Sequence, residues 1–185
     1  MSRIAGHLRQ IGVIVPDIDR AILHWTRNLG VGPFLLIPEV RFENYRYRGK
    51  AMPGPKVSLA FAQSGPLQIE LIQQHDRVPS AYLEFLEVSK GGVQHLCAWA
   101  DSSVEYERLH AKLRDQGFQE IHQGNVEGAE GRFCYFGGDG NANDPLLEIS
   151  EGNLPDIRPL WERLQQRADR WDGTHPLINL ADLAG

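Results

Sequence analysis

Several features that mark specialised classes of protein are missing from this chain of 185 residues. It contains no run of about 18 consecutive apolar residues, which a membrane-spanning helix needs. Its first residues do not combine a basic segment with a following apolar stretch, as a secretory signal does. Only two cysteines occur, Cys97 and Cys134, and both lie in apolar runs where cysteine usually packs as a small hydrophobic residue. These absences favour a reduced protein located in the cytoplasm.

An excess of positive charge is missing as well. The net charge is −5, so the composition gives no electrostatic argument for a nucleic acid or an anionic membrane as a partner. A phosphate-binding loop is also lacking, because the glycine cluster at 137–140 precedes an expected strand and does not open a helix. We therefore interpret residues 139–144 as a turn. The histidines that we expect to be structural or solvated, and not ligands, are His24, His110, His122 and His175.

What the chain does contain is a pattern that occurs twice. Residues 10–17 predict a buried strand followed by a helix that ends at Gly30, and residues 95–101 begin a second strand and helix that end at Gly117. Each helix is followed by further strand-like segments, the last of which contains one glutamate, Glu70 or Glu148. The matched positions are 85 residues apart for Gln10 and His95, and 78 apart for Glu70 and Glu148. The pattern predicts two β-α-β-β-β units, at about 7–74 and 93–151.

The predicted fold class is therefore α+β. Both units belong to one expected domain, residues 1–152, and residues 153–185 form a helical extension that belongs to neither unit. The extension is predicted from apolar residues that share one helix face: Ile157, Trp161, Leu164, Ala168 and Trp171. Two roles are open for it, since it could cover exposed core or could cover a pocket or a partner subunit.

Charged residues inside apolar strands are the candidates for a functional site. Glu70 and Glu148 are each flanked by apolar neighbours, so each carboxylate either faces solvent or is held inside by a partner. His95 also lies in an apolar strand, where a single histidine is often only a hydrogen-bonded core residue. Because the three residues occupy matched positions of the repeat, we expect them to share one site between the units.

The duplicated unit, together with the opening Ile-Gly-Val-Ile-Val-Pro-Asp at 11–17, resembles the vicinal oxygen chelate superfamily, which includes glyoxalases, bleomycin-resistance proteins and dioxygenases. Residues 25–34 resemble the glyoxalase-like branch that contains the methylmalonyl-CoA epimerases. The resemblance implies that the two units curl into a half-open mixed barrel around a divalent metal ion. It implies four ligands: Gln10, Glu70, His95 and Glu148. Gln10 departs from the family, which usually has histidine at that position.

One imidazole and three oxygen ligands suit Mg²⁺, Mn²⁺, Co²⁺, Ni²⁺ or Zn²⁺. Extradiol dioxygenase chemistry is disfavoured, because non-haem iron sites use two histidines and one carboxylate. In the related glyoxalase and epimerase reactions an enediolate or enolate is stabilised by the metal while a carboxylate moves a proton, a role open here to Glu148 or Glu70. A second base in the epimerase manner would lie at 57–63, where no acid is present. The sequence thus favours a single-base isomerase or a lyase.

Substrate contacts are expected from polar and aromatic residues near the predicted mouth of the site: Gln68, Gln73, Tyr47 and Trp99. The resemblance implies a small oxygenated molecule or a thioester as the substrate. The alternative is a metal-free small-molecule binding protein of the bleomycin-resistance type, which Gln10 favours, whereas Glu70, His95 and Glu148 together favour the enzyme. A structural module has no support in the sequence. Family resemblance also suggests a homodimer.

Overall fold

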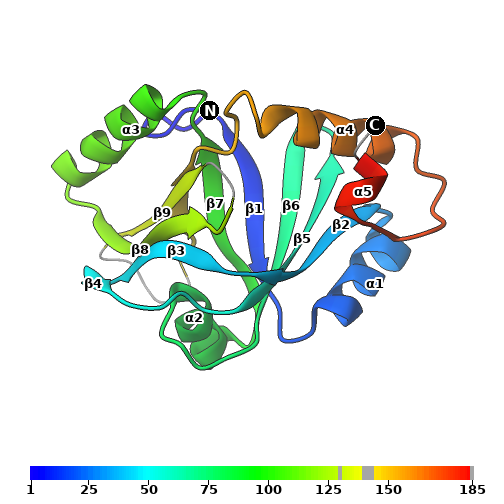
Figure 1. The fold of residues 1–185 in the computed structure, drawn as a ribbon, viewed down its shortest axis with the longest axis horizontal. Coiled ribbons are helices and arrows are strands. Elements are labelled where there is room, and N and C mark those ends of the chain that lie inside the picture. The colour runs from blue at the N-terminus through cyan, green and yellow to red at the C-terminus, as the bar shows by residue number, and fades with distance from the viewer. Residues whose placement is uncertain (129–130, 139–143, 184–185) are drawn as a thin grey trace.

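A computed structural model describes residues 1–128, 131–138 and 144–183. Within these residues eleven strands form one strongly curled sheet in the order β11-β2-β5-β6-β1-β7-β10-β9-β8-β3-β4 (Figure 1). The strands are β1 Leu8–Ile14, β2 Phe34–Val40, β3 Phe42–Tyr47, β4 Lys50–Ala51, β5 Val57–Ser64, β6 Leu67–Gln74, β7 Gly92–Trp99, β8 Gln119–Val126, β9 Arg132–Gly137, β10 Leu146–Ser150 and β11 Leu177–Ile178. The helices are α1 Ile18–Leu29, α2 Ala81–Ser89, α3 Ser103–Asp115, α4 Arg158–Asp169 and α5 Leu180–Leu183.

The two repeated units of the sequence form the two halves of the sheet. The first unit contributes β2-β5-β6-β1 and the second contributes β7-β10-β9-β8, with β1 and β7 antiparallel at the centre. Each last strand lies parallel to its own first strand, β6 beside β1 and β10 beside β7. The predicted α+β fold, two β-α-β-β-β units in a half-open mixed barrel with a C-terminal helix, is confirmed.

Local sequence explains why the two outer helices begin and end where they do. Asp17 caps α1 by accepting a hydrogen bond from the Arg20 amide, and Gly30 ends the helix with φ of 66°. Ser102 caps α3 in the same way, accepting from the Glu105 amide. The apolar faces of these helices bury the outer face of the sheet, α1 against β5 and β6 and α3 against β9 and β10. The inner face of the curl therefore remains for a cavity.

The connection between β2 and β3 crosses the open side of the curl. Val40 at the end of β2 pairs with Val57, whereas Phe42 at the start of β3 pairs with Val126 at the other edge of the sheet. Figure 1 shows β3 beside β8, with α4 over one end of the sheet and α2 below the other. The chain from β2 to β3 thus passes between the two edges of the curled sheet without pairing them directly, and the barrel is half-open.

Two further elements bear on the site. Residues Ala81–Ser89 form the helix α2, and β8 runs from Gln119 to Val126. His122 consequently lies inside β8 and is buried. Of the turn predicted at 139–144, only Asp144 lies among the described residues. Within the described residues, no helix is long and apolar enough to cross a membrane.

Candidate metal centre

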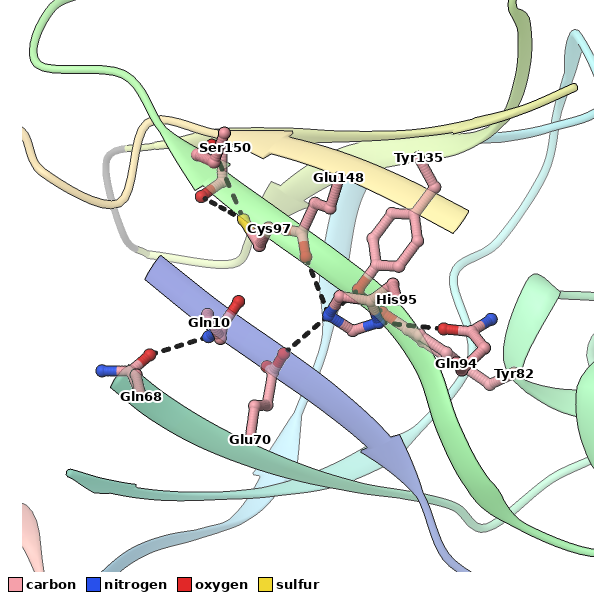
Figure 2. Close-up of polar contacts among 11 residues, drawn as sticks. Gln10, Gln68, Glu70, Tyr82, Gln94, His95, Cys97, Tyr135, Glu148 and Ser150 are labelled. Carbon is pink, nitrogen blue, oxygen red and sulfur yellow. Dashed lines mark hydrogen bonds and ion pairs between the residues drawn. The ribbon is translucent and has the colours of Figure 1, made fainter. Parts of the chain in front are cut away.

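Four strands that are neighbours at the centre of the sheet bring the four expected site residues together. Glu70 comes from β6, Gln10 from β1, His95 from β7 and Glu148 from β10, and these strands are adjacent in that order. All four side chains point to the inner face of the curl, as Figure 2 shows. The repeat therefore does what its matched positions predicted, placing polar residues from both units in one place.

The imidazole of His95 lies between the two carboxylates. Its Nε2 atom is 3.0 Å from Glu148 Oε2 and 3.4 Å from Glu70 Oε2. His95 is fully buried, and Glu70 and Glu148 are only 8% and 6% exposed. One ligand-type atom from each residue lies within 4.8 Å of the other two. Three donors this close and this buried can converge on a single cation.

Gly12 makes this position of the ring possible. It lies two residues after Gln10 on β1 and pairs with His95 across the central strands. A Cβ atom built on Gly12 would lie 1.6 Å from Cε1 of the His95 ring. Only a residue without a side chain lets the imidazole lie across β1 toward Glu70, which is a common reason for glycine inside a strand.

The orientation of the imidazole is fixed from behind by Gln94. Nδ1 of His95 lies 2.9 Å from Gln94 Oε1, while Nε2 of the same amide donates to the Ala81 carbonyl at the start of α2. With its nitrogen used in this way, Gln94 offers its oxygen as an acceptor, so Nδ1 of His95 carries the hydrogen. Nε2 is then directed at the carboxylates, the arrangement found behind many metal-binding histidines.

The three residues change one another's acidity. Burial alone would lower the pKa of His95, but interaction with the carboxylates of Glu148 and Glu70 outweighs burial and raises that pKa to about 9. The pKa of Glu70 is raised, first by burial and further by the nearby Glu148 carboxylate, against the lowering effect of His95. A buried charge is tolerated only with a partner, so a proton on His95 holds the cluster together when no cation is bound.

Gln10 presents an oxygen atom to the site. Its Nε2 donates to Gln68 Oε1 at 2.7 Å, which leaves Oε1 of Gln10 on the side of the amide away from Gln68 (Figure 2). Nε2 of Gln68 is buried and has no hydrogen-bond partner among the described residues. Gln68 can therefore donate a hydrogen bond into the cavity beside the cluster.

Aromatic residues form a layer beside the cluster, and the contact of His122 with this layer was not predicted from the sequence. The Tyr135 hydroxyl lies 3.4 Å from His95 Nε2 and 3.4 Å from the Tyr82 hydroxyl. The ring of His122 stacks edge-on against Tyr135 at 4.2 Å between centroids, and burial together with the charge of His95 lowers its pKa to about 3. His122 is therefore neutral. The sequence feature that could have indicated a buried His122 is its position within a strand-like segment, two residues before Gly124.

The cluster lies at the base of a cavity of about 770 Å³. The sheet supplies part of its wall, including Phe61, Trp99 and Phe133, and the C-terminal segment supplies Leu160 and Trp161. The C-terminal helix therefore lines a pocket, and because Leu164 packs into the core it also covers core, so it has both of the roles that the sequence left open. A cavity of this size is in the range that binds small molecules.

Of the expected substrate contacts, Gln68 and Trp99 line this cavity, but Gln73 and Tyr47 do not. Gln73 has the opposite strand parity to Glu70, and its Oε1 accepts a hydrogen bond from the Ile18 amide at the start of α1. Tyr47 lies at the end of β3, where its hydroxyl donates to Glu84. The prediction that these two residues contact substrate does not fit their positions.

The strand in which an epimerase-like second base was sought presents no acid. Leu59 and Phe61 of β5 line the cavity, and Ser58, which precedes them, donates to the Pro38 carbonyl on the other face. Both titratable carboxylates near the base of the cavity thus belong to the cluster itself.

A second group of potential ligands, His110, Glu120 and Cys134, lies on the outer side of the sheet. Glu120 already interacts with His110 at 3.3 Å and with Arg114 at 3.4 Å. Burial raises the pKa of the Cys134 thiol, so that the sulfur stays protonated and is a poor ligand. These properties make it a weaker candidate than the central cluster.

The central residues fit a divalent cation. Glu148 Oε2 is buried and, within the described residues, has no partner in hydrogen-bonding geometry, even though His95 is close to it. Such an atom has lost its hydration without a full replacement, and a cation would supply one. Carboxylate, amide and imidazole donors together match the preferences of the divalent ions expected from the sequence.

Comparison with known proteins agrees with the fold described above. The structure is similar to methylmalonyl-CoA epimerase from Mycobacterium tuberculosis, with 21% sequence identity, a TM-score of 0.52, and 81% of this chain and 90% of the epimerase covered. It is also similar to a hypothetical protein from Bacillus halodurans, with 21% identity, a TM-score of 0.54, and coverage of 78% and 92%. No curated protein sequence matches the chain. These likenesses show a common fold.

The sequence itself identifies the family. Residues 9–136 match the glyoxalase/bleomycin resistance protein/dioxygenase superfamily, which is well over half of the chain. The matched segment includes β1, β6 and β7, which carry Gln10, Glu70 and His95, and ends before the strand that carries Glu148. The chain belongs to the glyoxalase/bleomycin resistance protein/dioxygenase superfamily.

Proposed function

We propose that this protein is a metal-dependent isomerase or lyase of the glyoxalase type, which moves a proton on a carbon next to a substrate carbonyl. The observation that carries the proposal is the buried cluster at the base of the cavity, where His95 Nε2 lies 3.0 and 3.4 Å from two carboxylates contributed by different units. A purely structural histidine needs one partner, and two convergent carboxylates favour a cation site.

Glu70, His95 and Glu148 would hold the cation, with Oε1 of Gln10 as the fourth ligand. Bound there, a divalent cation supplies Lewis-acid stabilisation of the negative charge that develops on a substrate oxygen. Gln94 keeps Nε2 of His95 facing this point, and Gly12 leaves room for the ring. Gln94 and Gly12 therefore fix the position of the imidazole before substrate binds. Such preorganisation of charged and polar groups lowers the free energy of the transition state.

Glu148 and Glu70 are the candidate bases. Both line the cavity, so either carboxylate can take a proton from a carbon beside the substrate carbonyl and return it to the neighbouring position. The raised pKa of Glu70 brings that carboxylate closer to the acidity suited to such a transfer. The unpaired Nε2 of Gln68 can donate a hydrogen bond to a substrate oxygen. Since β5 offers no acid, the reaction uses one face of the substrate.

One observation favours the alternative, a metal-free binding protein. A protonated His95 places one positive charge beside both carboxylates without any cation, and its raised pKa favours that protonated form. In that case the apolar cavity would hold a ligand that the protein does not transform. A homodimer and a cytoplasmic location stay predictions of the sequence and belong to either function.

Metal content decides between the two functions. The protein is dialysed in turn against Mn²⁺, Ni²⁺, Co²⁺ and Zn²⁺, freed of loosely bound ions, and measured by plasma mass spectrometry. We expect about one ion per chain, lost in His95→Ala and kept in His24→Ala, a control on the exposed face of α1. Loss in His110→Ala instead would move the metal to the outer cluster, and no retention of any ion would refute the metal-dependent function.

Proton transfer is tested with Glu148→Gln. Metal-loaded protein is mixed in D₂O with a panel of 2-hydroxy ketones, hemithioacetals and acyl thioesters, and exchange of the proton next to the carbonyl is followed by NMR. Removing the base should slow exchange by about 10³-fold while the fold is unchanged. Equal exchange in the wild type and in Glu148→Gln would exclude this carboxylate as the base.

A further inference from the structure

Part of the cavity wall comes from the C-terminal segment, which lies outside the residues that match the family. This part of the wall indicates which kind of substrate fits the cavity. Residues 9–136 match the superfamily, but Ile157, Leu160, Trp161 and Leu180 of the C-terminal segment also line the cavity. The substrate must therefore fit a surface that this chain adds to the shared scaffold.

The added surface is fixed in place. Trp161 donates from Nε1 to the Gly152 carbonyl at 2.9 Å, and its ring lies 6.0 Å from Trp99 and 5.1 Å from Phe61 between centroids. Leu164, one turn further along α4, is completely buried in the inner core. Arg163 and Arg167 donate to main-chain carbonyls of α5, which ties the two helices together. A preformed aromatic wall of this kind binds flat apolar groups at little cost in side-chain entropy.

The charges around the cavity do not suit a phosphorylated substrate. Among the described lining residues there are six carboxylates and two arginines. Arg41 is paired with Glu39 at 2.8 Å, and Arg132 is held by Glu151 at 2.8 Å and lies over the Tyr106 ring. Both cations are thus already used by carboxylates. Phosphate groups are normally bound by free arginine, lysine or helix N-termini.

We propose that the substrate is an unphosphorylated molecule in which a flat apolar ring system is joined to the reacting carbonyl group. The carbonyl oxygen reaches the cluster of Glu70, His95 and Glu148, and the ring lies against Trp99, Phe61 and Trp161. The placement of the carbonyl rests on the proposed function, whereas the placement of the ring rests on the cavity wall alone. The C-terminal segment is on this view the element that determines specificity.

Three probes separate these two parts. Acetohydroxamate has two neighbouring oxygens and no ring, 2-naphthohydroxamate has both, and 2-naphthamide has the ring without the chelating pair. Binding to metal-loaded and metal-free full-length protein is measured by isothermal titration calorimetry. We expect 2-naphthohydroxamate to bind the loaded protein at least about 30-fold more tightly than acetohydroxamate does, because the ring is buried. Coenzyme A, a phosphorylated probe, should compete with neither.

The variants assign the ring preference to the wall. Trp161→Ala should reduce it about tenfold and leave acetohydroxamate binding unchanged, and Leu160→Ser, at a partly exposed position, should act in the same direction if Trp161→Ala displaces α4. Trp171→Ala is the matched control, since that ring lies against Gly32 and does not line the cavity. Equal affinity for both hydroxamates, or tight binding of coenzyme A, would overturn the proposal. If no hydroxamate responds to metal, the proposed function fails, and the ring site is then decided by whether 2-naphthamide binds in a Trp161-dependent way.

Discussion

The two β-α-β-β-β units share one scaffold but contribute different chemistry to the site between them. The second unit supplies the only imidazole, His95, whereas the first supplies an amide, Gln10, at the matched position. Two residues further along, the first unit has Gly12 where the second has Cys97. The first unit is therefore shaped to receive the ring of the second. A site on a duplicated scaffold can thus become unequal, with one half ligating strongly and the other making room.

The units also differ in how their outer strands are covered. β8, the outermost strand of the second unit in the sheet, is paired with β3, which belongs to the first unit's part of the chain. β2, the corresponding strand of the first unit, pairs with β5 on one side and, on the other, with the two-residue β11 beside the C-terminal helices. The C-terminal segment therefore completes the first unit as β3 completes the second, and it brings aromatic residues into the cavity while doing so.

The largest effect on this inequality is expected from Gly12→Ala. A Cβ at this position would overlap the His95 ring, so the ring or β1 must move. We expect a loss of about 3 kcal/mol in the free energy of unfolding, the upper range for overpacking, and a loss of metal binding. Urea denaturation measures the first quantity and metal content the second.

The double variant Gly12→Ala/His95→Ala is the control for that interpretation. Without the ring there is nothing for the new methyl group to overlap, so the cost of the alanine at position 12 should largely disappear. An equal cost in the presence and absence of His95 would mean that Gly12 is needed for the backbone and not for the imidazole.

The sequence predicted that Glu70, His95 and Glu148 share one site, because strand parity and repeat spacing can be recognised without the tertiary structure, and the family resemblance added Gln10. It did not predict the role of Gly12, since the contact with His95 depends on the register of β1 and β7, which shifts between Gly12 and Val13. It also missed the position of His122 beside Tyr135, and here the reason is the pairing of β8 with β9, which lines up residues far apart in the chain. Gln73 was misjudged because its parity was not applied at the end of its strand.

A second comparison concerns the residues three positions after the two glutamates, Gln73 and Glu151. Gln73 accepts one hydrogen bond from the Ile18 amide, whereas Glu151 accepts three from Arg132, through the amide, Nε and Nη2 at 2.8 to 3.0 Å. Burial alone would raise the pKa of Glu151, but these hydrogen bonds outweigh it and hold the pKa below its ordinary value. The second unit thus has, at this position, a charge pair between the buried Glu151 and the partly exposed Arg132, whereas the first unit has a neutral amide.

Glu151→Gln should lower the free energy of unfolding by about 2 kcal/mol at neutral pH, as hydrogen bonds to a charged group are lost. A carboxyl group whose pKa is lowered on folding stabilises the fold at pH values above its pKa in the unfolded chain, which is near 4.3. This stabilisation is lost as the pH falls through the lower pKa of the folded state. The difference between wild type and variant should therefore shrink between about pH 5 and pH 3. Urea denaturation across this range checks it, with Glu107→Gln as the control, because Glu107 binds the same arginine from an exposed position. A difference independent of pH would show that the charge of Glu151 does not matter.

The smallest effect is expected from a variant in which both units carry a histidine at the matched position. Gln10→His gives the first unit the imidazole that the second already has, at the cost of the hydrogen bond to Gln68. Nitrogen ligands favour Ni²⁺ and Zn²⁺ over Mg²⁺, so the affinity for the first two ions should rise about tenfold relative to Mg²⁺. Competition titrations with a metal-sensitive dye measure this ratio, and Gln10→Leu, which offers no donor, should weaken the binding of all three ions. If the leucine variant binds as the wild type does, Gln10 is not a ligand. The second unit would then supply two ligands, His95 and Glu148, and the first unit only Glu70. The two units would therefore contribute less equally to the site than their matched positions suggest.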